Sequence, residues 1–349
     1  MKANFLAGPV ALTPDVSAAF HLTPISHREP AFLEMMSRTR VSLKSLVNAS
    51  HVALMVGSGT LANDAVAAQL RCVGGPGLIL SNGEFGERLI DHARRWNLAF
   101  TAERHDWGQP IQWSRIRKSA VRHRPAWIWA VLAETSTGVI NPLAELLALS
   151  DRVGAQLCLD AVSAIGLMPV DLERVAFATA VSGKGLAAPP GLAAVFHHGH
   201  LGGSEQIPRY LDLAIYEAAD GVPFTHSSNL LAALDRSLAQ TCWSRKFERV
   251  GRMSAMLRVA LRNHGLPPLA AEADAAPGIV TVALPGEVST ADVAIALDGQ
   301  GFQVGFQSQY LQQRNWLQVC LMSEFDEAAL RLLPGTLARH VAMIRASYS

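Results

Sequence analysis

Lys184 stands in a segment of small and apolar residues, "ATAVSGKGLAAPPG" (178–191). Removing a lysine from water among such neighbours favours its neutral amine. A neutral amine is a nucleophile that forms a Schiff base with an aldehyde or a ketone. The sequence also allows an ordinary lysine here, whose stem lies on apolar residues while its amine reaches solvent.

Asp160 and the segment 57–60 are the other candidates for chemistry. Asp160 ends the apolar run "LCLDAV", where a carboxylate needs a cation, a metal, a protonated ring nitrogen or the next turn as its partner. The "GSGT" of residues 57–60 follows a predicted strand and opens a predicted helix, so its glycines and free N–H groups suit a phosphate. It is neither a Walker loop nor a GxGxxG motif, and a plain turn capped by Thr60 is the alternative.

Together these features match the needs of one cofactor, pyridoxal 5′-phosphate (PLP). PLP requires a lysine for its aldehyde, a carboxylate that keeps its pyridine nitrogen protonated, and a site for its phosphate. The chain supplies them in the order phosphate segment, Asp160, Lys184. The sequence therefore predicts PLP as the cofactor, with Lys184 and Asp160 as catalytic residues.

The elements that must position these residues alternate between strands and helices. Such alternation is typical of an α/β fold with a mostly parallel sheet, in which ligands bind beyond the carboxyl ends of the strands. The predicted strands are 51–56, 77–82, 126–134, 155–162 and 191–198. A long helix over about 236–264 then begins a smaller α+β domain. The expected division is an N-terminal arm 1–20, a large PLP-binding domain 21–235 and a small domain 236–349.

Composition excludes several other classes of protein. The formal net charge of the 349 residues is +1, so neither nucleic acid nor an anionic membrane is an expected partner. No apolar run reaches membrane-spanning length. The twelve histidines show no metal-ligand spacing, and no metal is expected. The four scattered cysteines form no CxxC pair, which favours free thiols and a cytoplasmic location.

The sequence resembles the class V aminotransferases, PLP-dependent enzymes of fold type I. The resemblance rests on "GPV", "GSGTLAN", "SNGEFGERL", "ETSTGVINPL", "LCLDAVSAIG", "SGKGLAAPPG" and the final strand and helix, which together span nearly the whole chain. It implies a large domain with a mostly parallel seven-stranded sheet between helices and a smaller C-terminal domain.

The resemblance also implies a role for each matching residue. Lys184 would form the Schiff base with the cofactor and then move a proton, and Asp160 would pair with the ring nitrogen. The other implied cofactor-binding residues are Ser58, Gly59 and Thr60 for the phosphate, Phe85 and Val162 for the two faces of the ring, Thr135 for the phenolic oxygen, and Ser182 as a further phosphate ligand.

The segment "PFTHSSNLLAAL" (223–234) resembles the part of the family through which a neighbouring subunit reaches the phosphate. Thr225 is the first choice for that contact and Ser227 the second. The resemblance therefore implies a homodimer with shared active sites. A run of residues that caps a helix is the alternative, because serine and threonine favour such positions.

The last predicted strand departs from the family pattern. Family members carry an arginine there that binds the α-carboxylate of the amino acid, whereas "WLQVCLMSE" places Gln318 at that position. A neutral amide cannot form the same charged pair; Arg314, four residues earlier, is a possible substitute. His27 and Arg28 in "ISHREPAF" resemble a segment that binds a distal phosphate in related enzymes, so they are expected to bind a phosphonate, phosphate or carboxylate. A structural salt bridge of Arg28 is the alternative.

The expected function is therefore amino-group transfer. A small amine or amino acid, including one that bears a phosphonate, would be the donor, and a 2-oxoacid such as pyruvate or glyoxylate the acceptor. Because Gln318 replaces the usual arginine, a PLP-dependent lyase, acting by elimination or carbon–carbon cleavage, is the alternative.

Overall fold

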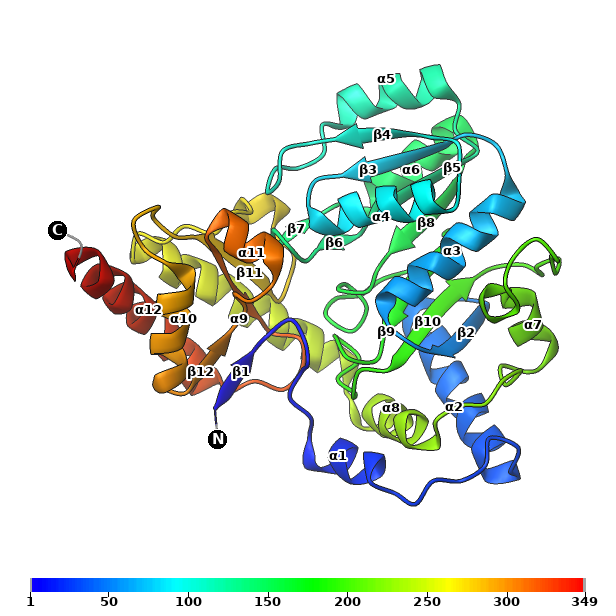
Figure 1. The fold of residues 1–349 in the computed structure, drawn as a ribbon, viewed down its shortest axis with the longest axis horizontal. Coiled ribbons are helices and arrows are strands. Elements are labelled where there is room, and N and C mark those ends of the chain that lie inside the picture. The colour runs from blue at the N-terminus through cyan, green and yellow to red at the C-terminus, as the bar shows by residue number, and fades with distance from the viewer. Residues whose placement is uncertain (1, 348–349) are drawn as a thin grey trace.

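A seven-stranded sheet forms the centre of the larger part of the computed structural model, which describes residues 2–347 (Figure 1). Six of its strands run in the same direction, and β10 alone runs antiparallel to both of its neighbours. In sheet order the strands are β2 (His51–Val56), β10 (Leu192–His197), β9 (Phe177–Val181), β8 (Gln156–Asp160), β5 (Trp127–Val131), β3 (Gly77–Ser81) and β4 (Phe100–Arg104). The α/β fold with a large, mostly parallel sheet is thus confirmed.

The central strands are mostly apolar because helices cover both faces of the sheet. In β5, "WIWAV", every residue is buried. Trp127 and Trp129 enter one core cluster and Ile128 enters the other, as the alternation of side chains along a strand requires. The helices that follow or precede these strands are α2 (Pro30–Val47), α3 (Gly59–Val73), α4 (Glu84–Arg95), α5 (Trp113–His123) and α6 (Leu143–Val153).

The C-terminal part of the chain builds two small sheets and a group of helices. One sheet joins β11 (Ile279–Ala283) to β13 (Trp316–Cys320), and the other joins β12 (Phe302–Val304) to β1 (Ala3–Phe5). The helices here are α9 (Trp243–Asn263), α10 (Thr290–Gly299), α11 (Gln309–Arg314) and α12 (Glu327–Ser347). Among the described residues, no helix is both long enough and apolar enough to cross a membrane.

The first strand belongs to the C-terminal part rather than to the large sheet. β1 pairs in parallel with β12, and Figure 1 shows it beside the elements at the far end of the chain. The segment 7–9 that follows β1 then passes along the largest cavity described below. Next, α1 (Pro14–Phe20) packs against α8 (Ser228–Gln240). The N-terminal arm therefore links both parts of the molecule.

The predicted single helix over about 236–264 is wrong. The structure has two helices, α8 and α9, separated at Thr241 and Cys242. Both residues have extended backbones, with ψ of 118° and 95°, so the helix cannot run through them. The predicted domain division near residue 235 stays a prediction.

Candidate active site

A cavity of about 640 Å³ lies where β2, β8 and β9 end. These strands point the same way, so their carboxyl ends meet at one edge of the sheet. The structure brings together there most of the residues that the sequence singled out. Those that line the cavity are Ser58, Gly59, Thr60, Phe85, Asp160, Val162 and Lys184.

Asp160 lines this cavity and is 5% exposed. Its carboxylate accepts hydrogen bonds from the Asn63 Nδ2, at 2.9 Å, and from the Val162 N–H, at 3.1 Å. Thr179 in turn donates to Asn63 Oδ1, at 3.2 Å. Burial raises the pKa of Asp160, and the two donors and Lys184 oppose that rise. A buried carboxylate held this way would be stabilised further by a cation or an N–H donor on the cavity side.

Lys184 lies in the turn after β9, and burial lowers the pKa of its amine. No described residue forms a hydrogen bond or a salt bridge with its Nζ, although Asp160 and Cys320 act on it electrostatically. Ser182 does not line the cavity. Its hydroxyl instead donates to the Pro189 carbonyl, at 2.6 Å, and accepts from the Leu192 N–H, at 3.1 Å. Ser182 therefore closes the loop that carries the lysine.

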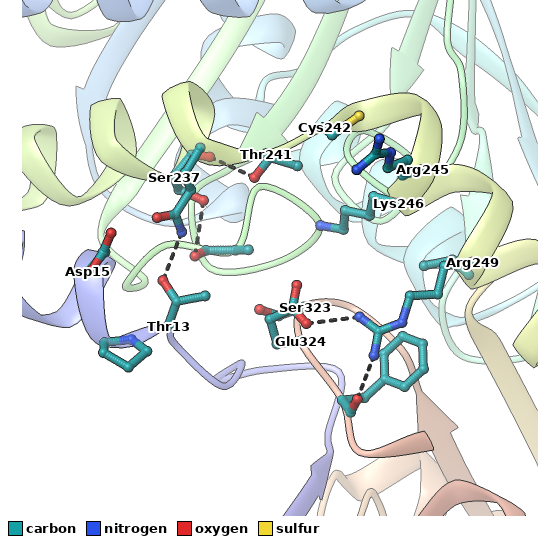
Figure 2. A pocket seen from close by; sticks show the side chains of 15 residues that line it. Thr13, Asp15, Ser237, Thr241, Cys242, Arg245, Lys246, Arg249, Ser323 and Glu324 are labelled. Carbon is teal, nitrogen blue, oxygen red and sulfur yellow. Dashed lines mark hydrogen bonds and ion pairs between the residues drawn. The ribbon is translucent and has the colours of Figure 1, made fainter. Parts of the chain in front are cut away.

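Two side chains that line a neighbouring cavity of about 470 Å³ form hydrogen bonds with the same loop (Figure 2). Lys246 Nζ donates to the carbonyl of Gly185 and, at 3.3 Å, to that of Met322. Ser237 donates to the carbonyl of Leu186, at 2.7 Å. Burial lowers the pKa of Lys246 to about 8. Sequence reasoning missed both residues, because nothing in helices α8 and α9 indicates that they contact the lysine loop.

The start of α3 fits an anion. Ser58 is its N-cap residue and Gly59 its first residue, so the first N–H groups of the helix lack intrahelical partners. The hydroxyls of Ser58 and Thr60 bond to no described residue. A Cβ atom on Gly57 would lie 2.3 Å from Leu61 Cδ2, and one on Gly59 would lie 3.2 Å from Val162 Cγ2. The glycines thus allow the backbone to pack closely at this turn, beside the free N–H groups that suit a phosphate.

Phe85 is positioned by Glu134, a residue that sequence reasoning missed. The fully buried Glu134 carboxylate accepts from the N–H groups of Phe85, at 3.3 Å, and Gly86, at 3.1 Å, and from Ser136 Oγ, at 2.5 Å. Burial raises the pKa of Glu134 and these bonds oppose the rise. Next to it, the Thr135 hydroxyl bonds with Ser163 Oγ at 2.5 Å and does not line the cavity.

Arg88 is a further cavity residue that the sequence did not single out. It lies one helical turn after Phe85, with its guanidinium carbon 4.9 Å from the centre of that ring. Its Nε donates to Glu84 Oε1, at 2.9 Å, while half of the side chain stays exposed. The pattern "EFGER" contained the signal, because residues three apart on a helix share a face.

Gln318 does not line this cavity; it is 1% exposed and lines a neighbouring cavity of about 490 Å³. Its Nε2 donates to the Thr135 carbonyl and, at 2.9 Å, to Thr281 Oγ1. The side chain thereby fastens β13 and β11 to the segment after Glu134. Arg314 stacks on Trp107, 3.8 Å from the ring centre, and on Trp316, 5.1 Å away. Neither residue lines the 640 Å³ cavity.

His27, Arg28 and Thr225 also lie outside the cavity of their own chain. They come from two segments that contact each other, because the Ile25 N–H donates to Ser228 Oγ at 3.1 Å. Thr225 is exposed, and Ser227 caps α8 by accepting from the Leu230 N–H at 3.3 Å. The two segments therefore form one surface region.

Solved structures of other proteins share this architecture. An alanine–glyoxylate aminotransferase from Nostoc sp. superposes with a TM-score of 0.85 and 27% identity over 97% of this chain and 95% of its own. The fold is therefore that of the fold type I aminotransferases. The family model "Aminotransferase class-V" matches residues 15–208. This chain belongs to the class-V aminotransferase family.

Other proteins are similar in sequence to this chain over different parts of its length. The chain is 32% identical over 301 residues to a protein named soluble hydrogenase 42 kDa subunit from Anabaena cylindrica, covering 80% of this chain and 78% of that protein. It is 34% identical over 149 residues to a 2-aminoethylphosphonate–pyruvate transaminase from Pseudomonas entomophila, covering 42% and 40%. The predicted enzyme class, a PLP-dependent aminotransferase, is thus confirmed, and the lyase alternative is not favoured.

Proposed function

We propose that this chain holds PLP at Lys184 and transfers an amino group from a small amine or amino acid to a 2-oxoacid such as pyruvate or glyoxylate. The observation that carries the proposal is the convergence of Lys184, Asp160 and the start of α3 on one cavity. The donor set suits PLP, since it offers an amine, a buried carboxylate and an anion site.

Each residue has a distinct task in the proposed reaction. PLP, when bound, supplies an electron sink for the substrate's Cα. Asp160 would keep the pyridine nitrogen protonated, Phe85 and Val162 would contact the ring, and the start of α3 would hold the phosphate. Lys184 Nζ would hold the cofactor and would also serve as the base that takes the Cα proton and as the acid that returns one. Its lowered pKa suits that work, because a general base must be neutral at the working pH.

Arg88 is the proposed partner for the acidic group of the substrate. Gln318 already donates its amide to Thr135 and Thr281, and Arg314 stacks between two tryptophans. Arg88 lines the cavity with half of its side chain exposed. The names of two similar proteins include glyoxylate and 2-aminoethylphosphonate, which carry a carboxylate and a phosphonate. A guanidinium binds either group through two parallel hydrogen bonds.

Arg88→Met should raise KM for the oxoacid by about 10- to 100-fold, the usual effect of losing a charged hydrogen-bonded partner. Arg88→Lys should recover part of the loss. Steady-state kinetics with pyruvate and glyoxylate would measure both. Arg95→Met, on the exposed side of the same helix, should leave KM unchanged. An unchanged KM in Arg88→Met would exclude Arg88 as the anion site.

We further propose a homodimer in which the surface region of His27, Arg28 and Thr225 completes the partner's cavity. The support is that this region lies outside its own cavity and resembles the segments that the family uses across subunits. His27 and Arg28 would then face the distal end of the substrate, and Thr225 the phosphate.

Mixed dimers test this arrangement directly. Lys184→Ala and the double variant Arg28→Ala/Thr225→Ala should each be nearly inactive. After unfolding and refolding together in equal amounts, half of the dimers should be hybrids with one intact site each. The mixture should then recover about a quarter of wild-type activity. A triple variant with all three changes, mixed with Lys184→Ala, is the matched control and should stay inactive. Equal activity in both mixtures would refute shared sites.

The cytoplasm is the proposed location. Cys72 and Cys242 are free and exposed, and Cys158 and Cys320 are free and buried. Free exposed thiols are typical of a reducing compartment.

The visible absorption spectrum of the purified protein tests the proposed function. We expect the band of bound PLP, which one donor among L-alanine, L-serine, L-aspartate and 2-aminoethylphosphonate should convert to the band of the amine form. A 2-oxoacid should then restore the first band. Release of ammonia without that conversion would indicate a lyase, and a protein that shows no band after PLP is added would refute the site.

A further inference from the structure

We propose that the histidine and glutamate side chains at the β2 end of the large sheet form a site for a divalent transition metal of the zinc type. The ligands are His51 on β2, His200 in the loop after β10, and Glu217 on α7 (Leu213–Ala218). One ligand atom from each lies within 4.8 Å of the other two. Figure 1 shows α7 beside the loop that leaves β10.

Both imidazoles approach the same carboxylate oxygen. His200 Nδ1 contacts Glu217 Oε1 directly, and His51 Nδ1 lies 3.9 Å from that oxygen. The two rings are 5.6 Å apart and inclined by 60°, so they do not stack and both can face a common point. Zinc ligands lie about 2.0–2.2 Å from the ion. Small side-chain rotations would therefore place the three ligand atoms around one ion, with water in the fourth position.

One oxygen of the Glu217 carboxylate lacks a hydrogen-bond donor within the part of the chain that the structure describes. Glu217 Oε2 is buried and finds no hydrogen-bond partner among the described residues. The buried ring of His197 stacks on His51, with centres 4.9 Å apart and planes inclined by 10°, and so fixes the orientation of that ligand. The guanidinium of Arg40 acts on Glu217 electrostatically but donates its hydrogen bonds to the carbonyls of Val52 and Asp220, at 3.3 and 2.6 Å. A metal cation would satisfy the lone pairs that converge here.

Sequence spacing gave no sign of this site, because its ligands come from three separate elements. The strand pairing brings them together, since His51 pairs with His197 at the start of the β2–β10 ladder. A bound ion would join β2, α7 and the loop between β10 and α7. The ion would thus stabilise the folded position of a loop that has few buried residues.

Calorimetric titration of the untagged holoenzyme with ZnCl₂ near neutral pH tests the proposal. We expect one ion per chain. His200→Ala should weaken binding by at least about tenfold, and Glu217→Gln should do the same. His200 is 88% exposed, so its removal should leave the fold intact, which circular dichroism would confirm. His123→Ala, an exposed histidine on α5, is the matched control and should bind Zn²⁺ like the wild type.

Two further readouts separate this site from adventitious binding to exposed thiols. Co²⁺ should give the visible bands of a low-symmetry N/O site in the wild type but not in His200→Ala. Zn²⁺ should slow tryptic cleavage after the exposed Arg209, in the loop between β10 and α7, only when His200 is present. Absence of saturable binding, or equal affinity in His200→Ala and the wild type, would overturn the proposal.

Discussion

Lys184→Ala should lower kcat by at least about 10⁴-fold, the upper range for loss of a general base, because the residue has two tasks. In the proposed reaction it supplies the amine that holds the cofactor, and it moves the substrate proton. Lys246 also contacts this loop but cannot replace Lys184, because its amine donates to the carbonyls of Gly185 and Met322. Turnover with the best donor of the amine panel would measure the loss.

The spectrum of Lys184→Ala separates a chemical defect from a folding defect. The visible band of lysine-bound PLP should disappear, while the thermal unfolding midpoint stays near that of the wild type. Lys118→Ala, at an exposed lysine on α5, serves as control and should retain both band and turnover. Sustained turnover by Lys184→Ala would remove the central residue from the mechanism.

Asp160→Asn should lower kcat by about 10²- to 10³-fold, within the range for loss of a preorganised electrostatic partner. Asparagine has nearly the same shape and can still accept the bond from Val162. It carries no charge, however, and therefore cannot keep a pyridine nitrogen protonated. Because the site is buried, solvent cannot substitute for the missing charge.

Kinetics and cofactor affinity together test this second prediction. The Kd for PLP should rise far less than kcat falls, because the substitution leaves the proposed phosphate site at the start of α3 unchanged. Asp151→Asn, which removes an exposed carboxylate paired with Arg174, is the control and should behave like the wild type. A kcat for Asp160→Asn within about twofold of the wild type would show that the ring nitrogen needs no charged partner here.

The sequence was sufficient for those parts of the site that are set by neighbouring residues. Three short segments carry these residues, and each lies at the end of a buried strand. They are the "GSGT" segment, the end of the strand that contains Asp160, and the lysine loop. The carboxyl ends of parallel strands meet at one edge, so their proximity could be predicted without coordinates. The motif order along the chain was also enough to indicate the family.

The rest of the site depends on contacts between distant segments. Gln318 occupies the expected strand, but its orientation is decided by the carbonyl of Thr135 and the hydroxyl of Thr281. Glu134 and Lys246 act through backbone groups of other loops, which leave no trace in residue types. The break between α8 and α9 was missed because Thr241 and Cys242 are neither proline nor glycine, the residues that usually mark the end of a helix in a sequence.

The pairing of β1 with β12 has a mechanical consequence. Phe5 is fully buried, which anchors the strand to the C-terminal part, while residues 7–9 line the reaction cavity. A Cβ on Gly8 would lie 3.4 Å from the carbonyl oxygen of Gly183, beside the lysine. Residues 3–9 thus connect β12, through β1, to the wall of the cavity. Any rotation of the C-terminal part would move residues 7–9 with it, so the shape of the cavity would change with the angle between the two parts.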